Sequence, residues 1–213
     1  MVFEDNSLKN LHDGLRDMGL DTRILEGYTR VGWIPKKFQF YGMSVQPWNV
    51  PKILGTIEIR NSPVRCIHLI REWTEASWHR QFLDKRQYEV CYRNIYVVLD
   101  SNIYDMNEYR EINSIRVKSG LLPKSMVIVK WESEKDDKLL KYLNADTLLN
   151  LDLAKLSEDI TVRSFLEYLL WEISSSHIRI RKNPFRISVN MTPSRLQWNC
   201  YEKIARYLNQ RRD

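Results

Sequence analysis

Alternating apolar and polar residues in the segment 53–59 restrict the fold of this chain more than any other feature of its sequence. Ile53, Gly55, Ile57 and Ile59 occupy every second position of this segment, which is the period of a strand with one buried face. The triplet Asn-Ser-Pro at 61–63 predicts a turn, and a partner strand is expected over 64–70. Runs rich in β-branched and aromatic residues predict three further strands, at 88–99, 112–117 and 126–131.

Helix is expected mainly after the last strand, because no glycine occurs beyond Gly120. Leucines at 139, 140 and 143 begin one amphipathic segment, and the apolar spacing from Val162 to Ile173 predicts a second helix. Thr192 and Pro193 form an N-cap and first-turn pair for a last helix.

Three other segments have weaker patterns. Apolar residues at 8, 11 and 15 predict an N-terminal amphipathic helix. The charged segment 71–87 has no clean period and is expected to be an irregular or helical insertion. Alternation on both sides of the Asn-Pro pair at 183–184 predicts a short basic hairpin over 178–189.

At 213 residues the chain is long enough for one domain with a packed core and too short for several. Hydrophobic residues make up 43% and charged residues 28%, which disfavours wholesale disorder. The sequence has no run of about 18 apolar residues, and its acidic first residues are unlike a secretory signal. Three cysteines are an odd, sparse set that fits a reducing compartment, so we expect an intracellular protein.

Positive charge is segregated along the chain. The net charge is +6, but residues 97–176 are acidic overall, and residues 177–213 carry nine cations and two acids. Such segregation favours a polyanionic partner, although moderate positive charge also occurs in proteins that bind none.

Two stretches carry more specific information than the strand pattern. Residues 40–59 read FYGMSVQPWNVPKILGTIEI, and residues 113–131 read NSIRVKSGLLPKSMVIVKW, with DDKLLKYLNADTLL soon after. They resemble the entry and first strand, the fourth and fifth strands, and the trailing helix of the OB domain shared by the middle subunit of replication protein A and its telomere-capping counterpart. The segment 71–87 departs from this family, whose region between the second and third strands is usually shorter and more acidic. Chain length, element order and the basic C-terminal segment also resemble OB subunits of the telomere-capping assembly called terminin.

This resemblance covers about residues 38–150 and implies a fold that is mainly β with α: a five-stranded OB-type barrel followed by a C-terminal helical extension. We accordingly expect an N-terminal arm or helix (1–30), an OB-like domain with its trailing helix (31–150), and a basic helical extension with a short hairpin (151–213). The resemblance also implies a non-catalytic subunit of a telomere-capping complex in the nucleus, at chromosome ends. Its partners would be single-stranded DNA and other capping subunits, with no cofactor, metal, membrane or small-molecule substrate.

Arginine and tryptophan are interleaved around the second and third predicted strands. Single-stranded nucleic acid needs both, because bases stack on rings while cations contact phosphates. The alternative is that the tryptophans plug one end of the barrel and the charges form a solvated face. The candidate binding residues are Arg65, His68, Arg71, Trp73, Trp78, Arg80 and Arg93, with Lys85 and Arg86 beside them.

A second basic set lies in the C-terminal segment. In a strand over 178–180, Arg179 and Arg181 share an outer face, which suits a phosphate-facing ridge. The alternative is a solubilising surface. The candidate binding residues are Arg179, Arg181 and Arg186, with Lys182, Arg195, Arg206, Arg211 and Arg212 nearby.

The helix after the fifth strand packs against partner subunits in the resembled family. The candidate partner-binding residues are Leu139, Tyr142, Leu143 and Leu149. A stripe left uncovered by the barrel needs a partner helix. The alternative is that residues 160–208 fold back and bury this stripe within the same chain.

Other chemistries have weaker support. The spacing of possible zinc ligands is unlike that of structural sites, for Cys66, His68, His79 and Cys91. The nearest carboxylate and lysine set for a metal-dependent nuclease is Glu132, Glu134 and Lys135. We therefore expect no enzyme. The runner-up function is a protein-interaction scaffold whose OB-like barrel does not bind nucleic acid, and a nuclease is a distant third.

Overall fold

The computed structural model describes residues 5–25, 52–75, 88–99, 110–119, 126–133, 138–156, 160–165, 170–174, 178–180 and 190–209. The chain divides into two compact units, and each unit combines segments that are distant in sequence. The first unit takes residues 1–58, 68–94 and 177–192, and the second takes 59–67, 95–176 and 193–213. These units differ from the consecutive segments 1–30, 31–150 and 151–213 that the sequence led us to expect, because strand pairing brings distant segments together.

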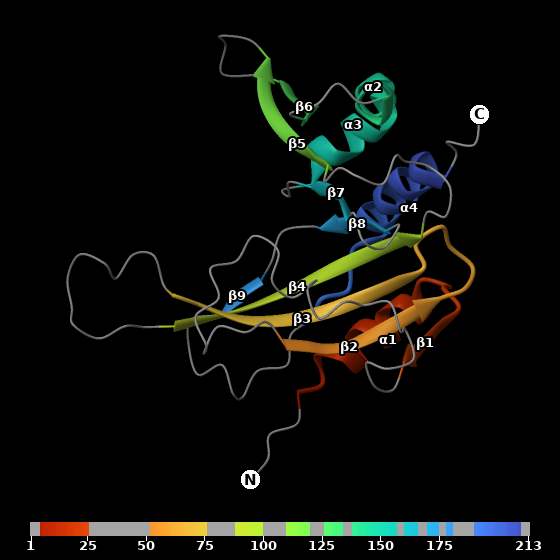
Figure 1. Cartoon of the computed structure of the whole chain (residues 1–213), viewed down its shortest axis with the longest axis vertical. Helices are drawn as coiled ribbons and strands as arrows, with labels where there is room; N and C mark the ends of the chain where they lie inside the picture. The colour runs from red at the N-terminus through yellow and green to blue at the C-terminus, as the bar shows by residue number, and fades with distance from the viewer. Residues whose placement is uncertain are drawn as a thin grey trace, which may run out of the picture. The chain divides into compact units, whose positions relative to one another are not determined.

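The first unit is a sheet with one helix. It holds α1 (Ser7–Asp17), β1 (Thr22–Leu25) and all or most of β2 (Lys52–Ile59), β3 (Cys66–Glu75) and β4 (Tyr88–Leu99). The strands follow the order β1-β2-β3-β4, and β9 (Ile178–Ile180) pairs antiparallel with the first part of β4 (Figure 1). Distant parts of the chain thus meet on β4.

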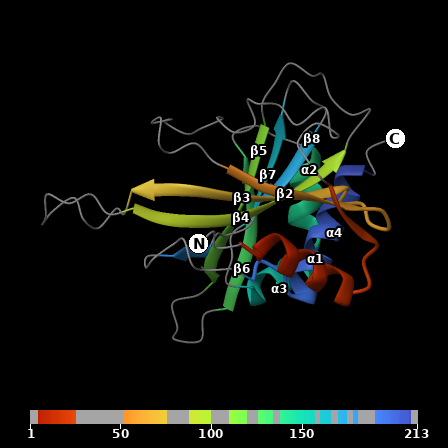
Figure 2. The same ribbon diagram turned by 90° about the horizontal axis from the view of Figure 1, so that it is seen from below.

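Helix α1 is held against the sheet by its apolar side, on which Leu11 and Leu15 are fully buried. The helix ends in a Schellman motif, where the Gly19 N–H donates to Arg16 and the Leu20 N–H donates to Leu15. Gly19 supplies the positive φ of 86° that this motif requires. Leu8 lies so close to Gly55 of β2 that a side chain at residue 55 would collide with it, so the first turn of α1 packs against β2. Figure 2 shows α1 beside the strands of this unit.

The second unit is an antiparallel sheet with three helices. The last part of β4 is followed in the sheet by β8 (Leu170–Ser174), β7 (Thr161–Phe165), β5 (Arg110–Ser119) and β6 (Met126–Ser133). Helices α2 (Lys138–Ala145) and α3 (Thr147–Lys155) pack on β6, and α4 (Arg195–Asn209) packs on both of them. The helices therefore cover the β6 side of the sheet.

Two asparagine side chains, of which Asn150 is buried, fix α2 and α3 to β6. The side chain of Asn144 receives a hydrogen bond from the Trp131 N–H and donates one to the Trp131 carbonyl, as a neighbouring strand would. The Trp131 indole N–H donates to Asn150 Oδ1 at 2.9 Å, and Asn150 Nδ2 donates to the Leu143 carbonyl. Because these polar groups have partners, the large indole is buried without an unsatisfied donor.

The predicted strands are confirmed, and the segment 71–87 is corrected in part. Strands β2, β4, β5 and β6 cover the runs expected for them. Strand β3 continues to Glu75, so residues 71–75 are neither irregular nor helical. The expectation for residues 76–87 lies outside the described residues.

The helix predicted from Val162 to Ile173 is wrong. Strands β7 and β8 occupy this segment and pair antiparallel, with Val162 opposite Ile173 and Phe165 opposite Leu170. The apolar spacing that matched a helix instead places apolar residues opposite each other across two strands. Pairing with β5, where Ile112 faces Val162, outweighs the local helical pattern.

Two smaller expectations near the C-terminal helix change. Strand β9 forms at 178–180 but pairs with β4, and the other half of the predicted hairpin lies outside the described residues. Ser194, not Thr192, caps α4: its Oγ accepts from the Gln197 N–H, and Gln197 Oε1 accepts from the Ser194 N–H at 2.5 Å. This is a capping box, which the S-x-x-Q spacing would have predicted.

The fold class is mixed α and β with antiparallel strand pairing, as the coarse expectation had it. Among the strands that the structure describes, the pairings of neither unit close into a ring, so the OB-type barrel stays a prediction. In the described segments no helix is both long and apolar enough to span a bilayer.

Candidate nucleic-acid interface

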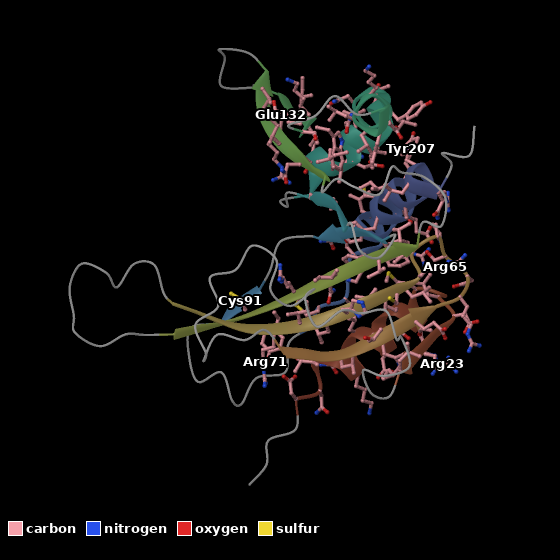
Figure 3. The ribbon with its side chains drawn as sticks, in the orientation of Figure 1. Arg23, Arg65, Arg71, Cys91, Glu132 and Tyr207 are labelled. Atoms are coloured by element: carbon pink, nitrogen blue, oxygen red, sulfur yellow. The ribbon has the colours of Figure 1, made fainter. Side chains whose placement is uncertain are left out.

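Two anion-binding donors converge on β3 and β4 of the first unit. The Arg71 guanidinium, from β3, donates to Asp5 Oδ2 at 3.3 Å, and the Tyr92 hydroxyl, from β4, donates to the same oxygen at 2.9 Å. The other carboxylate oxygen of Asp5 accepts from the Ser7 N–H at 3.0 Å, at the start of α1. Arg71 is labelled in Figure 3, on the strand next to β4. Neighbouring strands thus place a guanidinium and a hydroxyl around one anionic group.

The electrostatics of this cluster favour an anion. Burial alone raises the pKa of Asp5, but hydrogen bonds from Ser7 and Tyr92 and the positive charge of Arg71 outweigh it, so the pKa lies below its ordinary value of 3.8. Burial and the hydrogen bond to Asp5 raise the pKa of Tyr92. At neutral pH the carboxylate is therefore charged and the hydroxyl keeps its proton.

His68 is not a binding residue in this structure, although the sequence made it a candidate. Its side chain is fully buried, and Nδ1 lies 2.9 Å from the Thr56 hydroxyl of β2. Burial lowers its pKa to about 4, so the imidazole is neutral at physiological pH. Because β3 is covered on both faces at this point, a histidine there serves the core.

The turn between β2 and β3, which belongs to the second unit, carries two exposed arginines. Arg65 and Arg60 are exposed, and the Arg65 backbone is held on both sides: its N–H donates to the Val97 carbonyl and its carbonyl accepts from the Ile59 N–H. Ser62 Oγ accepts from the Val64 N–H inside the turn. Arg65 therefore projects from a rigid support (Figure 3).

For most other candidates of the first basic set, the structure does not describe the side chain. Arg93 of β4 is half-buried. Trp73 lies in β3, but its side chain is outside the description, as are Trp78, Arg80, Lys85 and Arg86 altogether. Stacking of bases on these tryptophans stays a prediction.

The second basic set is also described in part. Arg179 lies in β9 opposite Cys91 of β4, and its side chain is outside the description. On α4, Arg195 is exposed and Arg206 donates to Glu202 at 3.3 Å. The phosphate-facing ridge stays a prediction, because its other members lie outside the described residues: Arg181, Lys182, Arg186, Arg211 and Arg212.

Three of the four expected partner-binding residues are buried inside the chain. Leu139, Leu143 and Leu149 are at most 1% exposed, so they face the core of the second unit and not a partner. For these three leucines the alternative applies, in which the C-terminal part of the chain folds back and buries the stripe, because α4 packs over α2 and α3. Only Tyr142 is exposed, at 45%, and its ring stacks on that of Tyr207.

Sequence reasoning missed Asp5 and Tyr92 in the site and Leu148 and Leu151 on the surface. Asp5 meets its two partners across 66 and 87 residues of sequence, a separation that no local pattern can bridge. Leu148 and Leu151 are 70% and 41% exposed, whereas Leu149 is buried. The run Leu-Leu-Asn-Leu in a helix leaves open which leucine faces inward.

The described residues give little support to metal chemistry. They contain no group of histidine, cysteine and acidic side chains that could hold a metal ion. Cys66, Cys91 and Cys200 are free thiols and all buried, and burial raises the pKa of Cys200 to about 11. Glu132 is exposed and pairs with Lys130 at 3.4 Å, which fits surface charge.

No protein-family model matches this chain, and no curated protein or solved structure is significantly similar to it.

Proposed function

We propose that the chain is a non-catalytic subunit that binds single-stranded nucleic acid, specifically single-stranded DNA within a telomere-capping complex in the nucleus. The finer architecture that we propose is an OB-type barrel. Such a barrel has three adjacent strands and a last antiparallel hairpin. Here β2, β3 and β4 are adjacent and β5 pairs with β6, while β8 and β7 lie between β4 and β5 in the sheet. The family assignment rests on the resemblance of residues 40–59 and 113–131.

One observation supports this proposal more than any other: Arg71 and Tyr92, on adjacent strands, both donate hydrogen bonds to one carboxylate oxygen. Guanidinium and hydroxyl groups are among the side chains that commonly contact phosphate oxygens. The OB folds that bind single strands combine such groups with a sheet surface and stacking rings. The segregated positive charge of the sequence points to the same class of partner.

Comparing two arginine variants tests the proposal. Arg71→Gln should weaken binding of a labelled single-stranded oligonucleotide by about 1–2 kcal/mol, since a screened hydrogen bond to a charged group contributes about that much. The slope of log affinity against log salt should fall by about one. Fluorescence anisotropy at several salt concentrations measures both quantities.

Arg23→Gln is the matched control. Arg23 is 58% exposed in the same unit, pairs with Glu58 at 3.0 Å, and loses the same charge on substitution. Equal weakening by both variants would indicate nonspecific electrostatics, and no binding by the wild-type chain would refute the proposal. Recovery from nuclear extract with a defined set of proteins, identified by mass spectrometry, tests the capping assignment.

The second candidate function is a protein-interaction scaffold without nucleic-acid binding. It is favoured by the exposure of Leu148 and Leu151 on α3 and of Tyr142 on α2, since large apolar side chains are common in protein interfaces. The oligonucleotide assay separates the two functions directly.

A further inference from the structure

The contact of Asp5 with Arg71 and Tyr92 in the first unit differs from a tight structural ion pair. Its anion, Asp5, lies just outside α1, while both donors to Oδ2 belong to the sheet. Arg71 approaches with one nitrogen at 3.3 Å, which is longer than the 2.7–2.9 Å of strong charge-assisted hydrogen bonds. The side chains of Asp5 and Arg71 are 21% and 26% exposed, so water reaches both. The guanidinium of Arg71 is therefore only loosely held by this carboxylate, whereas the Tyr92 hydroxyl donates to it at 2.9 Å.

Asp5 can leave without disturbing the helix that carries it. Helix α1 begins at Ser7 and is anchored by the buried Leu11 and Leu15, one and two turns further on. Turning the Asp5 side chain outward breaks its hydrogen bonds to Ser7, Arg71 and Tyr92. Asn6 can stay in place, with its carbonyl accepting from the Asn10 N–H, so the first turn of α1 and the packing of the leucines are kept. A partly exposed ion pair contributes little free energy, so this movement has a small cost.

The sheet donors are suited to a phosphate as well as to a carboxylate. Tyr92 is buried in the present arrangement, in which Asp5 lies on its hydroxyl. Removing the carboxylate leaves a guanidinium and a hydroxyl on adjacent strands with no anion between them. A phosphodiester oxygen accepts from the same two donors in the same way.

We propose that Arg71 and Tyr92 form a phosphate site for the bound single strand, and that Asp5 occupies this site in the free chain as an intramolecular competitor. This inference rests on the proposed function and deepens it, because it assigns Tyr92 as a binding residue and Asp5 as a built-in restraint on affinity. A site that is occupied part of the time binds with an affinity lowered by the occupied fraction. Asp5 thus holds the affinity of the chain below its maximum.

Removing the competing charge should tighten binding. Asp5→Asn should raise the affinity for a short single-stranded oligonucleotide by about two- to fivefold, the range expected for a partly exposed ion pair. The same substitution in an Arg71→Gln background should have no effect, because the site is already lost. Tyr92→Phe should reduce the gain by removing the hydroxyl.

Asp13→Asn is the matched control for net charge. Asp13 lies on α1, is 54% exposed, has its Oδ1 3.3 Å from Nδ1 of the neighbouring His12, and loses the same charge on substitution. If Asp5→Asn and Asp13→Asn raise affinity equally, the effect is a general one of net charge and the inference is wrong. If the wild-type chain binds and Asp5→Asn binds no more tightly, the inference fails while the proposed function stands. If no variant binds, both fail.

A measurement on the wild-type chain removes any dependence on how the variants fold. Because the Ser7 N–H donates to Asp5 in the free chain, hydrogen–deuterium exchange at Ser7 should rise when the oligonucleotide is added in excess. Unchanged or slower exchange at Ser7 with the chain saturated would show that Asp5 stays in place, and would overturn the competitor role.

Discussion

Each unit of this chain has a carboxylate that accepts several hydrogen bonds, Asp5 in the first unit and Asp146 in the second, and the two differ in function. Asp5 joins the start of α1 to two sheet strands, and we propose that a bound phosphate replaces it there. Asp146 is only 8% exposed and accepts from the Leu149 N–H, from Lys203 at 2.7 Å and from the Tyr207 hydroxyl at 2.7 Å. It therefore caps α3 and ties α4 to the junction of α2 and α3, which is a structural role.

Asp146→Asn should destabilise the chain by about 1–3 kcal/mol at neutral pH, since it weakens hydrogen bonds to a nearly buried charge. Burial raises the pKa of Asp146, but the Leu149 N–H, Lys203 and Tyr207 outweigh it, so the pKa lies below 3.8. A lowered folded-state pKa means that the stabilisation is complete above 3.8 and is lost as pH falls through the lowered value. Urea denaturation of both proteins at neutral and at acid pH should show the difference shrinking, and a difference that persists in acid would contradict this role.

In helices α2 and α3, leucines close together in sequence differ in burial. Leu143 and Leu149 are buried while Leu148, next to Leu149, is 70% exposed. Buried and exposed leucines alternate along α2 and α3 because β6 and α4 cover only one side of these two helices. An amphipathic stripe that looks available in the sequence is already occupied in the folded chain.

Leu143→Glu and Leu148→Glu separate the buried from the exposed leucines. The first should cost several kcal/mol and lower the melting temperature by more than about 10 °C, because an unpaired charge enters the core. The second should leave the melting temperature nearly unchanged, since Leu148 is already in water. Thermal unfolding followed by circular dichroism measures both, and similar melting temperatures for the two variants would disprove the burial of Leu143.

At the scale of the whole molecule, the C-terminal helix α4 carries basic residues and also contributes side chains to the core. Helix α4 buries Trp198, Tyr201, Ile204 and Leu208, and the ring of Tyr201 lies 4.3 Å from that of Tyr96 on β4. The last part of the segment that looked like a basic extension, residues 193–213, thus belongs to the second unit. Its arginines cannot be tested by removing the whole segment, because the core would be removed with them.

Deleting residues 193–213 should abolish the cooperative unfolding of the second unit. Loss of a large buried side chain costs about 2–5 kcal/mol, and α4 supplies four of them against a typical total stability of about 5–15 kcal/mol. Deleting only residues 210–213 removes Arg211 and Arg212 but leaves α4 intact, so its melting temperature should match that of the wild type. Calorimetry of both truncated chains checks this, and an unchanged transition in the longer deletion would contradict it.

The sequence by itself determined the elements whose periodicity is local. Strands β2 and β4 and helix α1 lie where alternation and amphipathic spacing predict them, because a short period needs no distant partner to be recognised. The capping box of Ser194 and Gln197 also has a local spacing, although we expected Thr192 to be the N-cap residue.

Only the tertiary structure decided which of several compatible patterns applies. Val162 to Ile173 fits a helix by spacing, yet the cross-strand pairing of Val162 with Ile112 and Ile173 makes it two strands. His68 and Arg71 are near neighbours in one basic segment, yet covering of β3 on both faces buries the first, while the second reaches an anion. The meeting of Asp5 with Arg71 and Tyr92 depends on how α1 lies along the sheet. Burial and long-range pairing are properties of the whole fold, so a local pattern cannot contain them.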